Sequence, residues 1–303
     1  LPAGHMLVYE NGKAAISEYW DVQPGGSRRG FSAAREEFLA LLEESVRMRM
    51  ISDVPLGAFL SGGIDSSAIV AAMAKISAIP IKTFSIGFEE KSYSELPYSR
   101  LVAAKFKTDH QEKILSADIH SLVMQLAANL DEPLGDFSNF PTYLVSRLAR
   151  EKVTVALSGD GGDEIFGGYE HYLAQKLARF VDCSPLRPLG ALAGRALRLV
   201  PPSELKKGLV NRGKRLGEGF VNEAANRHFR WMLFLTRQQK SLLYSPAFRQ
   251  EKFMLDLPQR EPFQEFFRRS RRFSGINQDL YLDLKTYLTD DIMVKVDRMS
   301  MAA

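Results

Sequence analysis

The chain has 303 residues, of which 45% are hydrophobic and 25% are charged, and its formal net charge is +4. These values are those of an ordinary soluble globular protein, with room for one large domain or two smaller ones. The mild charge does not indicate a nucleic-acid partner, and no apolar run is long enough to cross a membrane. The single cysteine, Cys183, excludes a disulfide framework within the chain and predicts a cytoplasmic protein.

Residues 1–20 are predicted to form two short strands, because Asn11-Gly12 between them is a strong signal for a two-residue hairpin turn. A single hairpin is too small to fold alone, so we expect it to be the tail of a preceding domain. Residues 21–30 have the glycine and proline content of a linker. Since the chain starts with Leu1 rather than Met, we expect it to be a fragment.

The most informative local pattern is the run from Leu56 to Ser67, LGAFLSGGIDSS. Its apolar start predicts a buried strand, Ser61-Gly62-Gly63 predicts a tight turn, and the alanine-rich continuation predicts a helix. This arrangement presents backbone N–H groups and the positive end of a helix dipole to an anion. Because Asp65 places a carboxylate beside that anion, a metal ion is needed between them. The run therefore predicts a nucleotide-phosphate site that uses Mg²⁺.

Strand and helix patterns alternate over the first half of the chain. Alternation of this kind predicts an α/β fold, in which helices cover both faces of a parallel sheet. Ligands of such folds bind beyond the C-terminal ends of the strands, so the loop after Leu60, the glycine after Ile86 and the loop after Leu157 are expected to lie side by side. The expected strands are 56–60, 82–88, 110–115 and 153–157, and the expected helices are 31–50, 66–75, 94–107 with Ser94 as N-cap, 117–130 and 139–151.

A second glycine-rich segment, Ser158 to Tyr169, has the sequence SGDGGDEIFGGY. A flexible surface turn is the plain alternative, but the segment follows a predicted buried strand at the same sheet edge as the first loop. Its acids are therefore candidates to complete the metal site with Asp65. They are Asp160, Asp163 and Glu164.

Beyond Glu170 the strand patterns nearly vanish, and helices are predicted at 173–181, 186–199, 223–235 and 278–288. Basic residues crowd 187–215 and 268–272, where a solvated face is the favoured interpretation and a docking surface is the alternative. The five histidines show no metal-ligand spacing, so each is expected to be structural or exposed. The final run, 287–303, reads YLTDDIMVKVDRMSMAA and stops inside a motif-like stretch, so we expect a truncated C-terminus.

Three separated motifs, FLSGGIDSS, LSGDGGDEIFGGY and YLTDDIMVKVDRMSMA, together resemble the synthetase domain of glutamine-dependent asparagine synthetases, which are ATP pyrophosphatases. TFSIGF and DEPLGDFSNFPTY fit the same family. One glycine loop would be a weak match, whereas five motifs in the family's order are specific. The resemblance covers residues 31–303 as a synthetase domain, and residues 1–20 resemble the last hairpin of the family's N-terminal glutaminase domain.

The resemblance implies an adenine nucleotide α-hydrolase-like fold, a twisted parallel sheet with helices on both faces followed by a mostly helical part. It also implies an ATP-dependent amide ligase that converts aspartate to asparagine. The side-chain carboxylate attacks the α-phosphorus of ATP and releases pyrophosphate. Ammonia, supplied from glutamine by the N-terminal domain, then displaces AMP from the β-aspartyl-AMP intermediate.

Residue by residue, the resemblance assigns a pyrophosphate cradle, a metal site and a nucleoside site. The cradle would comprise Ser61, Gly62, Gly63, Ser66 and Ser67, and Asp65 and Asp163 match the Mg²⁺-binding acids. Leu60, Ile86, Ser158 and Gly159 match positions that hold adenosine or ribose, mainly through backbone.

Three more residues match positions that act on the reacting groups. Asp160 stands where well-studied members carry a glutamate that helps to form the intermediate or accepts the proton of ammonia, and it is one methylene shorter. Lys295 and Arg298 would bring positive charge to the phosphates. Asp291 and Asp297 either orient these two cations or form surface ion pairs with them.

Two other functions stay open. A related amidotransferase would amidate another carboxylate, on a sugar or a secondary metabolite, with the same ATP-binding loops. A nucleotide-binding module without catalysis is the third candidate, and the retained Asp65, Asp163 and Lys295 argue against it. Cys183 is not the N-terminal nucleophile of a glutaminase, so this chain is expected to use free ammonia at best. No nucleic-acid or membrane partner is expected, and a homodimer stays open.

Overall fold

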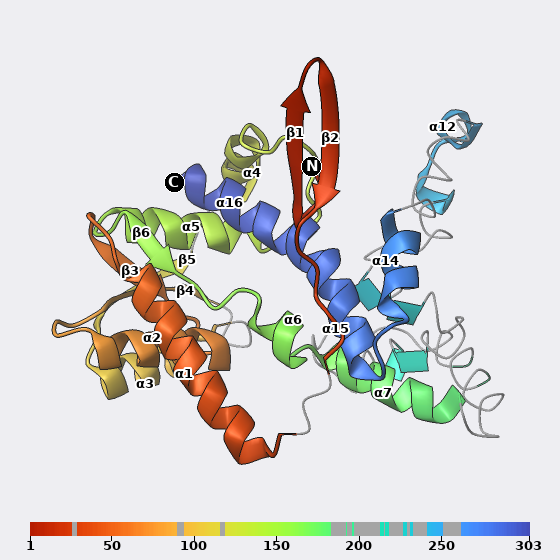
Figure 1. The fold of residues 1–303 in the computed structure, drawn as a ribbon. Coiled ribbons are helices and arrows are strands. Elements are labelled where there is room, and N and C mark those ends of the chain that lie inside the picture. Colours follow the sequence, from red (N-terminus) through yellow and green to blue (C-terminus); the bar gives the residue numbers. More distant parts are fainter. Residues whose placement is uncertain are drawn as a thin grey trace. The chain divides into compact units, whose positions relative to one another are not determined.

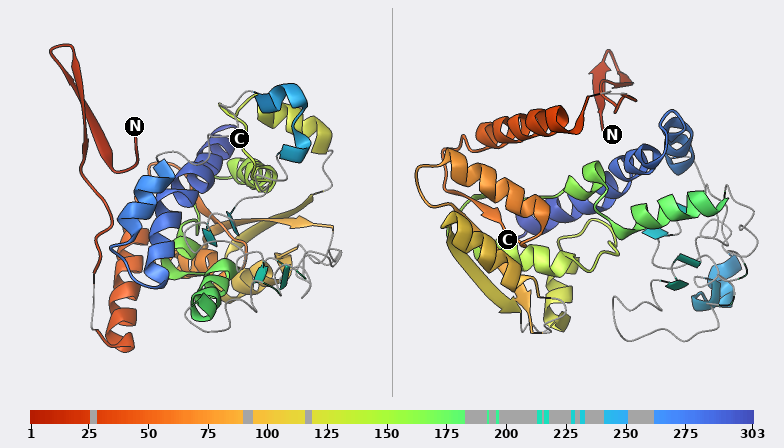
Figure 2. Two further views of the ribbon diagram at one scale, coloured as in Figure 1. Left: turned by 90° about the vertical axis from the view of Figure 1, so that its right-hand side faces the viewer. Right: turned by 90° about the horizontal axis from the view of Figure 1, so that it is seen from below.

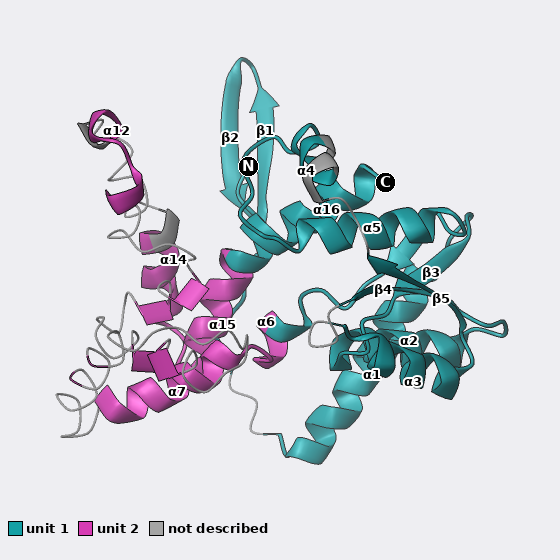
Figure 3. Cartoon of the chain, turned by 180° about the vertical axis from the view of Figure 1, so that it is seen from behind, with its two compact units in different colours: residues 1–163, 287–303 teal, residues 164–286 magenta. Residues whose placement is uncertain are grey.

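The computed structural model describes residues 1–25, 29–89, 94–115, 119–182, 192, 196, 213–214, 216–217, 227–228, 231–232, 241–250 and 262–303. The chain divides into two compact units, one formed by 1–163 with 287–303 and the other by 164–286 (Figure 3). The region expected to be one synthetase domain, 31–303, contributes to both. Cys183 lies outside the described residues, as do most residues of the helices expected at 186–199 and 223–235.

The N-terminal segment forms the expected hairpin. Strand β1 (His5–Glu10) pairs antiparallel with β2 (Lys13–Glu18), and Glu10 faces Lys13 across the turn. Asn11 and Gly12 both have positive φ values, 50° and 74°. Two consecutive residues of this conformation match the twist of a two-stranded ribbon, which is why Asn-Gly predicts such turns.

A four-stranded sheet forms the centre of the first unit (Figure 1). Its strands are β3 (Leu56–Phe59), β4 (Lys82–Phe88), β5 (Asp109–Leu115) and β6 (Val155–Leu157), in the order β5-β4-β3-β6. Every neighbouring pair is parallel. This confirms the predicted parallel sheet, and it puts the ends of β3, β4 and β6 at one edge.

Helices cover both faces of the sheet. Side chains of a strand alternate between its two faces, so each face contributes apolar side chains to a separate core. Ala58 and Leu60 point into a core with α1 (Phe31–Arg49), α2 (Ile64–Ile76) and α3 (Leu96–Phe106). On the opposite face Phe84 packs against α5 (Asn139–Arg150). The helices predicted at 31–50, 66–75, 94–107 and 139–151 are thus confirmed to within a few residues at their ends.

One predicted helix start is wrong. Glu95, not Ser94, is the N-cap of α3, and it makes no side-chain capping bond. Pro97 lies in the first turn of the helix, where its missing N–H and fixed φ favour a helix start. This proline was the better boundary signal.

The C-terminal segment returns to the first unit. A π-helical turn, η2 (Leu288–Ile292), leads into α16 (Met293–Met301), which lies beside α5 (Figures 1 and 2). Met299 is fully buried against α5 and α4 (Ile119–Ala127), in a cluster with Leu122, Leu126 and Tyr143. Residues 287–303 therefore complete the hydrophobic core of the sheet unit.

All elements described in the second unit are helical, as predicted for the part after Glu170. They are α7 (Glu170–Asp182), α12 (Pro246–Gln250), α14 (Pro262–Ser270) and α15 (Ile276–Lys285), and the short α6 (Gly162–Phe166) contains the boundary between the units. Among the residues that the structure describes, no helix is both long and apolar enough to cross a bilayer.

Candidate active site

The first glycine loop connects the end of β3 to α2. Leu60 is buried and directly follows β3, and its N–H donates to the Phe84 carbonyl at 2.9 Å. Gly62 has a φ of +83°, and a Cβ at this position would lie 2.5 Å from the Ser99 nitrogen. Both the conformation and the close approach of α3 require glycine here. Gly63, the N-cap of α2, makes no side-chain capping bond, so the helix N-terminus keeps N–H groups for an anion.

The three serines of the loop have different roles in the structure. The Ser61 and Ser66 hydroxyls lie 2.9 Å apart, and the Ser61 hydroxyl accepts the Gly63 N–H at 3.1 Å. These two side chains therefore hold the loop in shape. The Ser67 hydroxyl is buried and has no hydrogen-bond partner among the described residues. Since a buried hydroxyl without a partner is costly, Ser67 is the serine best placed to donate to a ligand.

The second glycine loop lies directly against the first. A Cβ at Gly159 would lie 2.6 Å from the Ser66 nitrogen, and a Cβ at Gly162 would lie 2.5 Å from Asp65 Oδ1. Gly161 has a φ of +91°, and Leu288 lies 3.8 Å from its Cβ position. The loop after β6 thus touches both the loop after β3 and the start of the C-terminal segment. The predicted adjacency of the two glycine loops is confirmed.

The acids of the two loops occupy different environments. Asp65, in the first turn of α2, and Asp163, which follows Gly162, are half-buried, whereas Asp160 is exposed. Glu164 is fully buried in the second unit and accepts a hydrogen bond from the Tyr169 hydroxyl at 2.5 Å. Glu164 is therefore not one of the acids exposed to a ligand at the loops.

The residues present fit a magnesium ion. Asp65 and Asp163 supply carboxylate oxygens, the ligands that Mg²⁺ prefers. Two glycines, Gly159 and Gly162, leave room around the Asp65 side chain that a Cβ would fill. Acids at a helix N-terminus next to a phosphate-type loop are also the arrangement in which a cation is needed.

The other residues expected to hold a nucleoside lie around the same sheet edge. Ile86 is a half-buried residue near the end of β4, and Ser158 and Gly159 are half-buried directly after β6. Ile86 lies within β4, Ser158 and Gly159 follow β6, and β3 lies between these two strands. Contacts of these residues with a nucleotide stay a prediction.

The two C-terminal cations are placed differently. The Lys295 Nζ donates to Asp136 Oδ2 at 3.0 Å and to Ser138 Oγ at 2.8 Å, with little solvent exposure. Arg298 is exposed and pairs with Asp131 and, at 3.9 Å, with Asp297. Lys295 is thus the interior cation, and Arg298 lies in surface ion pairs.

Sequence reasoning missed Asp136 and Ser138 as site residues, although both lie in the motif DEPLGDFSNFPTY. The usable signal was Asp-x-Ser directly before a helix, because such acids accept hydrogen bonds from the backbone two residues later. The structure contains that bond, from the Ser138 N–H to Asp136 Oδ1 at 2.8 Å.

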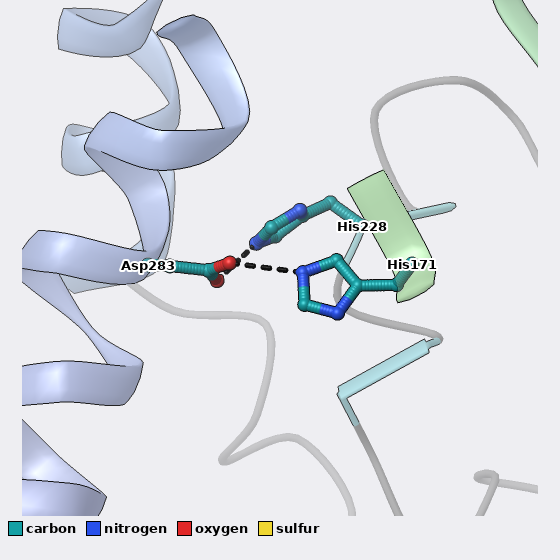
Figure 4. A group of neighbouring side chains, drawn as sticks. All are labelled: His171, His228 and Asp283. Atoms are coloured by element: carbon teal, nitrogen blue, oxygen red, sulfur yellow. Dashed lines mark hydrogen bonds and ion pairs between the residues drawn. The ribbon is translucent and has the colours of Figure 1, made fainter. Parts of the chain in front are cut away.

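A separate cluster in the second unit contains two histidines and an aspartate (Figure 4). His228 Nε2 lies 2.7 Å from Asp283 Oδ1, and His171 Nε2 lies 3.0 Å from Asp283 Oδ2. The Tyr172 hydroxyl also donates to Asp283 Oδ2, at 2.6 Å. Histidine and carboxylate are metal-ligand types, but here both carboxylate oxygens already accept hydrogen bonds. The Asp283 carboxylate therefore needs no ion to be satisfied, and it links α7 to α15.

Burial raises the pKa of the Asp283 carboxyl, but the hydrogen bonds from His171 and His228 outweigh it, so the pKa lies well below its usual range. Spacing in the sequence could not predict this cluster, since His171 and Asp283 are 112 residues apart. The expectation that these two histidines are structural agrees with the geometry.

A glycine-rich loop at the carboxyl edge of a parallel sheet, with a helix N-terminus and acids beside it, defines the class: an α/β protein with a phosphate-binding type of loop. The model of the asparagine synthase family matches residues 37–303. The chain therefore belongs to the asparagine synthase family.

Several curated relatives carry the same family name. The chain is 45% identical over 177 residues to the putative asparagine synthetase [glutamine-hydrolyzing] 2 of Methanocaldococcus jannaschii, covering 57% of this chain and 34% of that protein. It is 35% identical over 272 residues to asparagine synthetase [glutamine-hydrolyzing] 1 of Bacillus subtilis, covering 86% and 39%. A more distant match is amidase chyE of Penicillium rubens, 25% identical over 243 residues, covering 74% and 34%. The chain thus spans little more than a third of the length of these relatives.

Proposed function

We propose that this chain is the ATP-using part of an amide ligase that converts aspartate to asparagine, with AMP and pyrophosphate as the other products. One observation carries the proposal: three segments far apart in the sequence meet at one sheet edge. Gly159 and Gly162 lie against Ser66 and Asp65, and Gly161 lies against Leu288. A site that binds ATP and activates a carboxylate needs such a convergence of donors, acids and cations.

The first half-reaction is adenylation. A carboxylate oxygen attacks the α-phosphorus, the bond between the α and β phosphates breaks, and pyrophosphate leaves with the electron pair. Residues 61–67 would hold the departing pyrophosphate through backbone N–H groups and the Ser67 hydroxyl. Asp65 and Asp163 would hold Mg²⁺, which neutralises phosphate charge when bound. The nucleoside would be held by Leu60, Ile86, Ser158 and Gly159.

In the second half-reaction, ammonia attacks the activated carbonyl carbon, AMP leaves, and the nitrogen loses a proton. Asp160 is exposed at the tip of the second loop, where a carboxylate is available to accept that proton. Lys295 and Arg298 would supply positive charge to the phosphates, and the burial of Lys295 favours it as the direct contact. Ammonia would come from glutamine through an N-terminal glutaminase domain of the longer polypeptide.

A second candidate is a related amide-forming enzyme with another acceptor. The relative named amidase chyE supports it, because the ATP-binding loops do not specify the acceptor. A module that binds the nucleotide without turning it over is the third possibility to be tested.

The experiment is an acceptor-dependent pyrophosphate assay on the full natural polypeptide that contains these residues. ATP, Mg²⁺ and ammonia are supplied with aspartate or with a panel of other carboxylates. We expect pyrophosphate release that requires aspartate, with asparagine and AMP in equal amounts. Pyrophosphate release with another acid but not with aspartate would mean that the other acid is the acceptor. ATP binding without pyrophosphate release would favour the binding module.

A further inference from the structure

Lys295 is a charged residue on the buried face of a helix. Ile292, Lys295 and Met299 are all buried, and their spacing places them on one side of the η2–α16 segment. On this face, Met299 packs against apolar side chains such as Leu126. An apolar residue at 295 would suit such a face, so the ammonium group needs another explanation.

The ammonium group is held by the turn that precedes α5. Asp136 Oδ2 accepts from Lys295 at 3.0 Å and from the Ser138 hydroxyl at 2.6 Å, and Asp136 Oδ1 accepts the Ser138 N–H at 2.8 Å. The Ser138 hydroxyl in turn accepts from Lys295 at 2.8 Å. The turn fixes the carboxylate, and the carboxylate fixes the ammonium.

The ion pair is mostly buried, since the Lys295 and Asp136 side chains are 10% and 16% exposed. Buried ion pairs contribute little net stability, because removing both charges from water offsets their attraction. An ammonium has three N–H groups, and the described residues accept from two of those of Lys295. One N–H remains for a ligand.

Asp136 is the acid suited to hold this cation at neutral pH. Burial raises the pKa of Asp136, but the bonds from Ser138 and the charge of Lys295 outweigh it and lower the pKa. Asp291, one helical turn before Lys295, has its pKa raised by burial and by the charge of Asp136. Asp291 makes no hydrogen bond to Lys295 in the described contacts.

We propose that Asp136, with Ser138, is the positioning residue of Lys295, and that it aims the third ammonium N–H at the phosphates of ATP. This inference rests on the proposed function, since it assigns a role to Lys295 in the adenylation step. It predicts that Asp136 acts on catalysis only through Lys295.

The test is a double-mutant cycle on the full natural polypeptide, with aspartate-dependent pyrophosphate release as the assay. Asp136→Asn keeps the turn, because asparagine also accepts the Ser138 N–H, but it removes the charge. We expect kcat to fall about 100-fold with the KM values little changed, as for a misplaced catalytic group. Asp136→Glu restores the charge and should recover part of the rate.

The cycle separates positioning from structure. In a Lys295→Ala background, Asp136→Asn should cost nothing further, because the group it positions is gone. If the kcat losses of Asp136→Asn and Lys295→Ala multiply in the double variant, the inference is overturned. An Asp136→Asn variant with the wild-type kcat would also overturn it. Asp109→Asn is the matched control, since Asp109 forms an exposed pair with Lys82 at 3.4 Å, and it should keep full activity.

A second readout does not depend on turnover. Acylation of lysines, followed by peptide mass spectrometry, should label Lys295 slowly in the wild type and faster in Asp136→Asn. Lys75, 70% exposed, is the internal reference. Equal labelling of Lys295 in both proteins would overturn the contact. A wild type that releases no pyrophosphate with any acid would instead refute the proposed function.

Discussion

At the scale of single residues, the candidate site depends on glycines at points where two loops touch. Gly62 has a left-handed conformation beside α3, while Gly159 and Gly162 allow the second loop to lie against Ser66 and Asp65. A methyl group at either of the last two positions would collide with backbone or with a carboxylate. The repeated glycines of the motifs are therefore explained by contact between loops rather than by flexibility.

The change Gly162→Ala tests this explanation. Its Cβ would lie 2.5 Å from Asp65 Oδ1, so the carboxylate must move away from the position in which we propose that it binds Mg²⁺. We expect the Mg²⁺ concentration for half-maximal ATP use to rise about 10- to 100-fold, with little change in thermal stability.

Gly25→Ala is the control for Gly162→Ala, because no atom of the described residues lies within 4 Å of the Cβ position at Gly25. Asp65→Ala gives the limiting case and should abolish Mg²⁺-dependent ATP use while the fold persists. An unchanged Mg²⁺ dependence in Gly162→Ala would remove Asp65 from the metal site.

At the scale of elements, helix pairs are held by different interactions in the two units. In the first unit, α16 lies on α5 through an apolar cluster that includes Met299 and Tyr143. In the second unit, α7 is tied to α15 through the Asp283 carboxylate and its partners, His171 among them. The first kind of contact weakens when volume is lost, and the second when charge is lost.

Asp283→Asn should destabilise the second unit by about 3 kcal/mol, because it removes one partner of a buried charged network. The lowered pKa of Asp283 also predicts a pH effect. A lowered folded-state pKa stabilises the protein above the usual aspartate value of about 4, and this stabilisation is lost as the pH falls below it. Urea unfolding from pH 7 to pH 3 measures both effects.

The difference between wild type and Asp283→Asn should therefore shrink as the pH falls. Asp279 works in the opposite sense, since burial raises its pKa and the Asp283 charge adds to that rise. The exposed pair of Asp109 provides the control, for which we expect less than about 1 kcal/mol. A constant difference across the pH range would contradict the assigned role of Asp283.

At the scale of the whole molecule, the chain leaves its first unit after Asp163 and comes back to it at Tyr287. The returning segment brings both Lys295 and Met299. The core of the sheet unit therefore includes residues from the far end of the sequence, and the same segment carries a candidate catalytic cation.

Deleting residues 287–303 should expose the cluster around Leu122, Leu126 and Tyr143. Loss of a fully buried methionine side chain alone costs about 2–5 kcal/mol, so the sheet unit should be destabilised by at least that amount. Urea unfolding followed by circular dichroism, with binding of a hydrophobic dye, measures the effect. Deleting the exposed hairpin, residues 1–20, should change stability little; equal effects of the two deletions would refute the role of the C-terminal segment.

The sequence by itself determined the local structure and the family. Asn11-Gly12 specified a turn whose two residues have positive φ, and the apolar run ending at Leu60 specified a strand followed by a glycine loop. These features depend on neighbours a few residues apart, so periodicity and turn chemistry reveal them. The wrongly predicted start of α3 also has a local cause, because Pro97 marks the start of this helix better than Ser94 does.

Only the tertiary structure decided which residues meet across the chain. Lys295 and Arg298 look equivalent in the sequence, and packing against α5 decides that Lys295 is the buried one. Its partner Asp136 is 159 residues away, and the histidines of the Asp283 cluster are likewise distant in sequence. Local sequence patterns cannot predict such pairs. The pairs form when helices pack, and packing depends on the shape of the whole core.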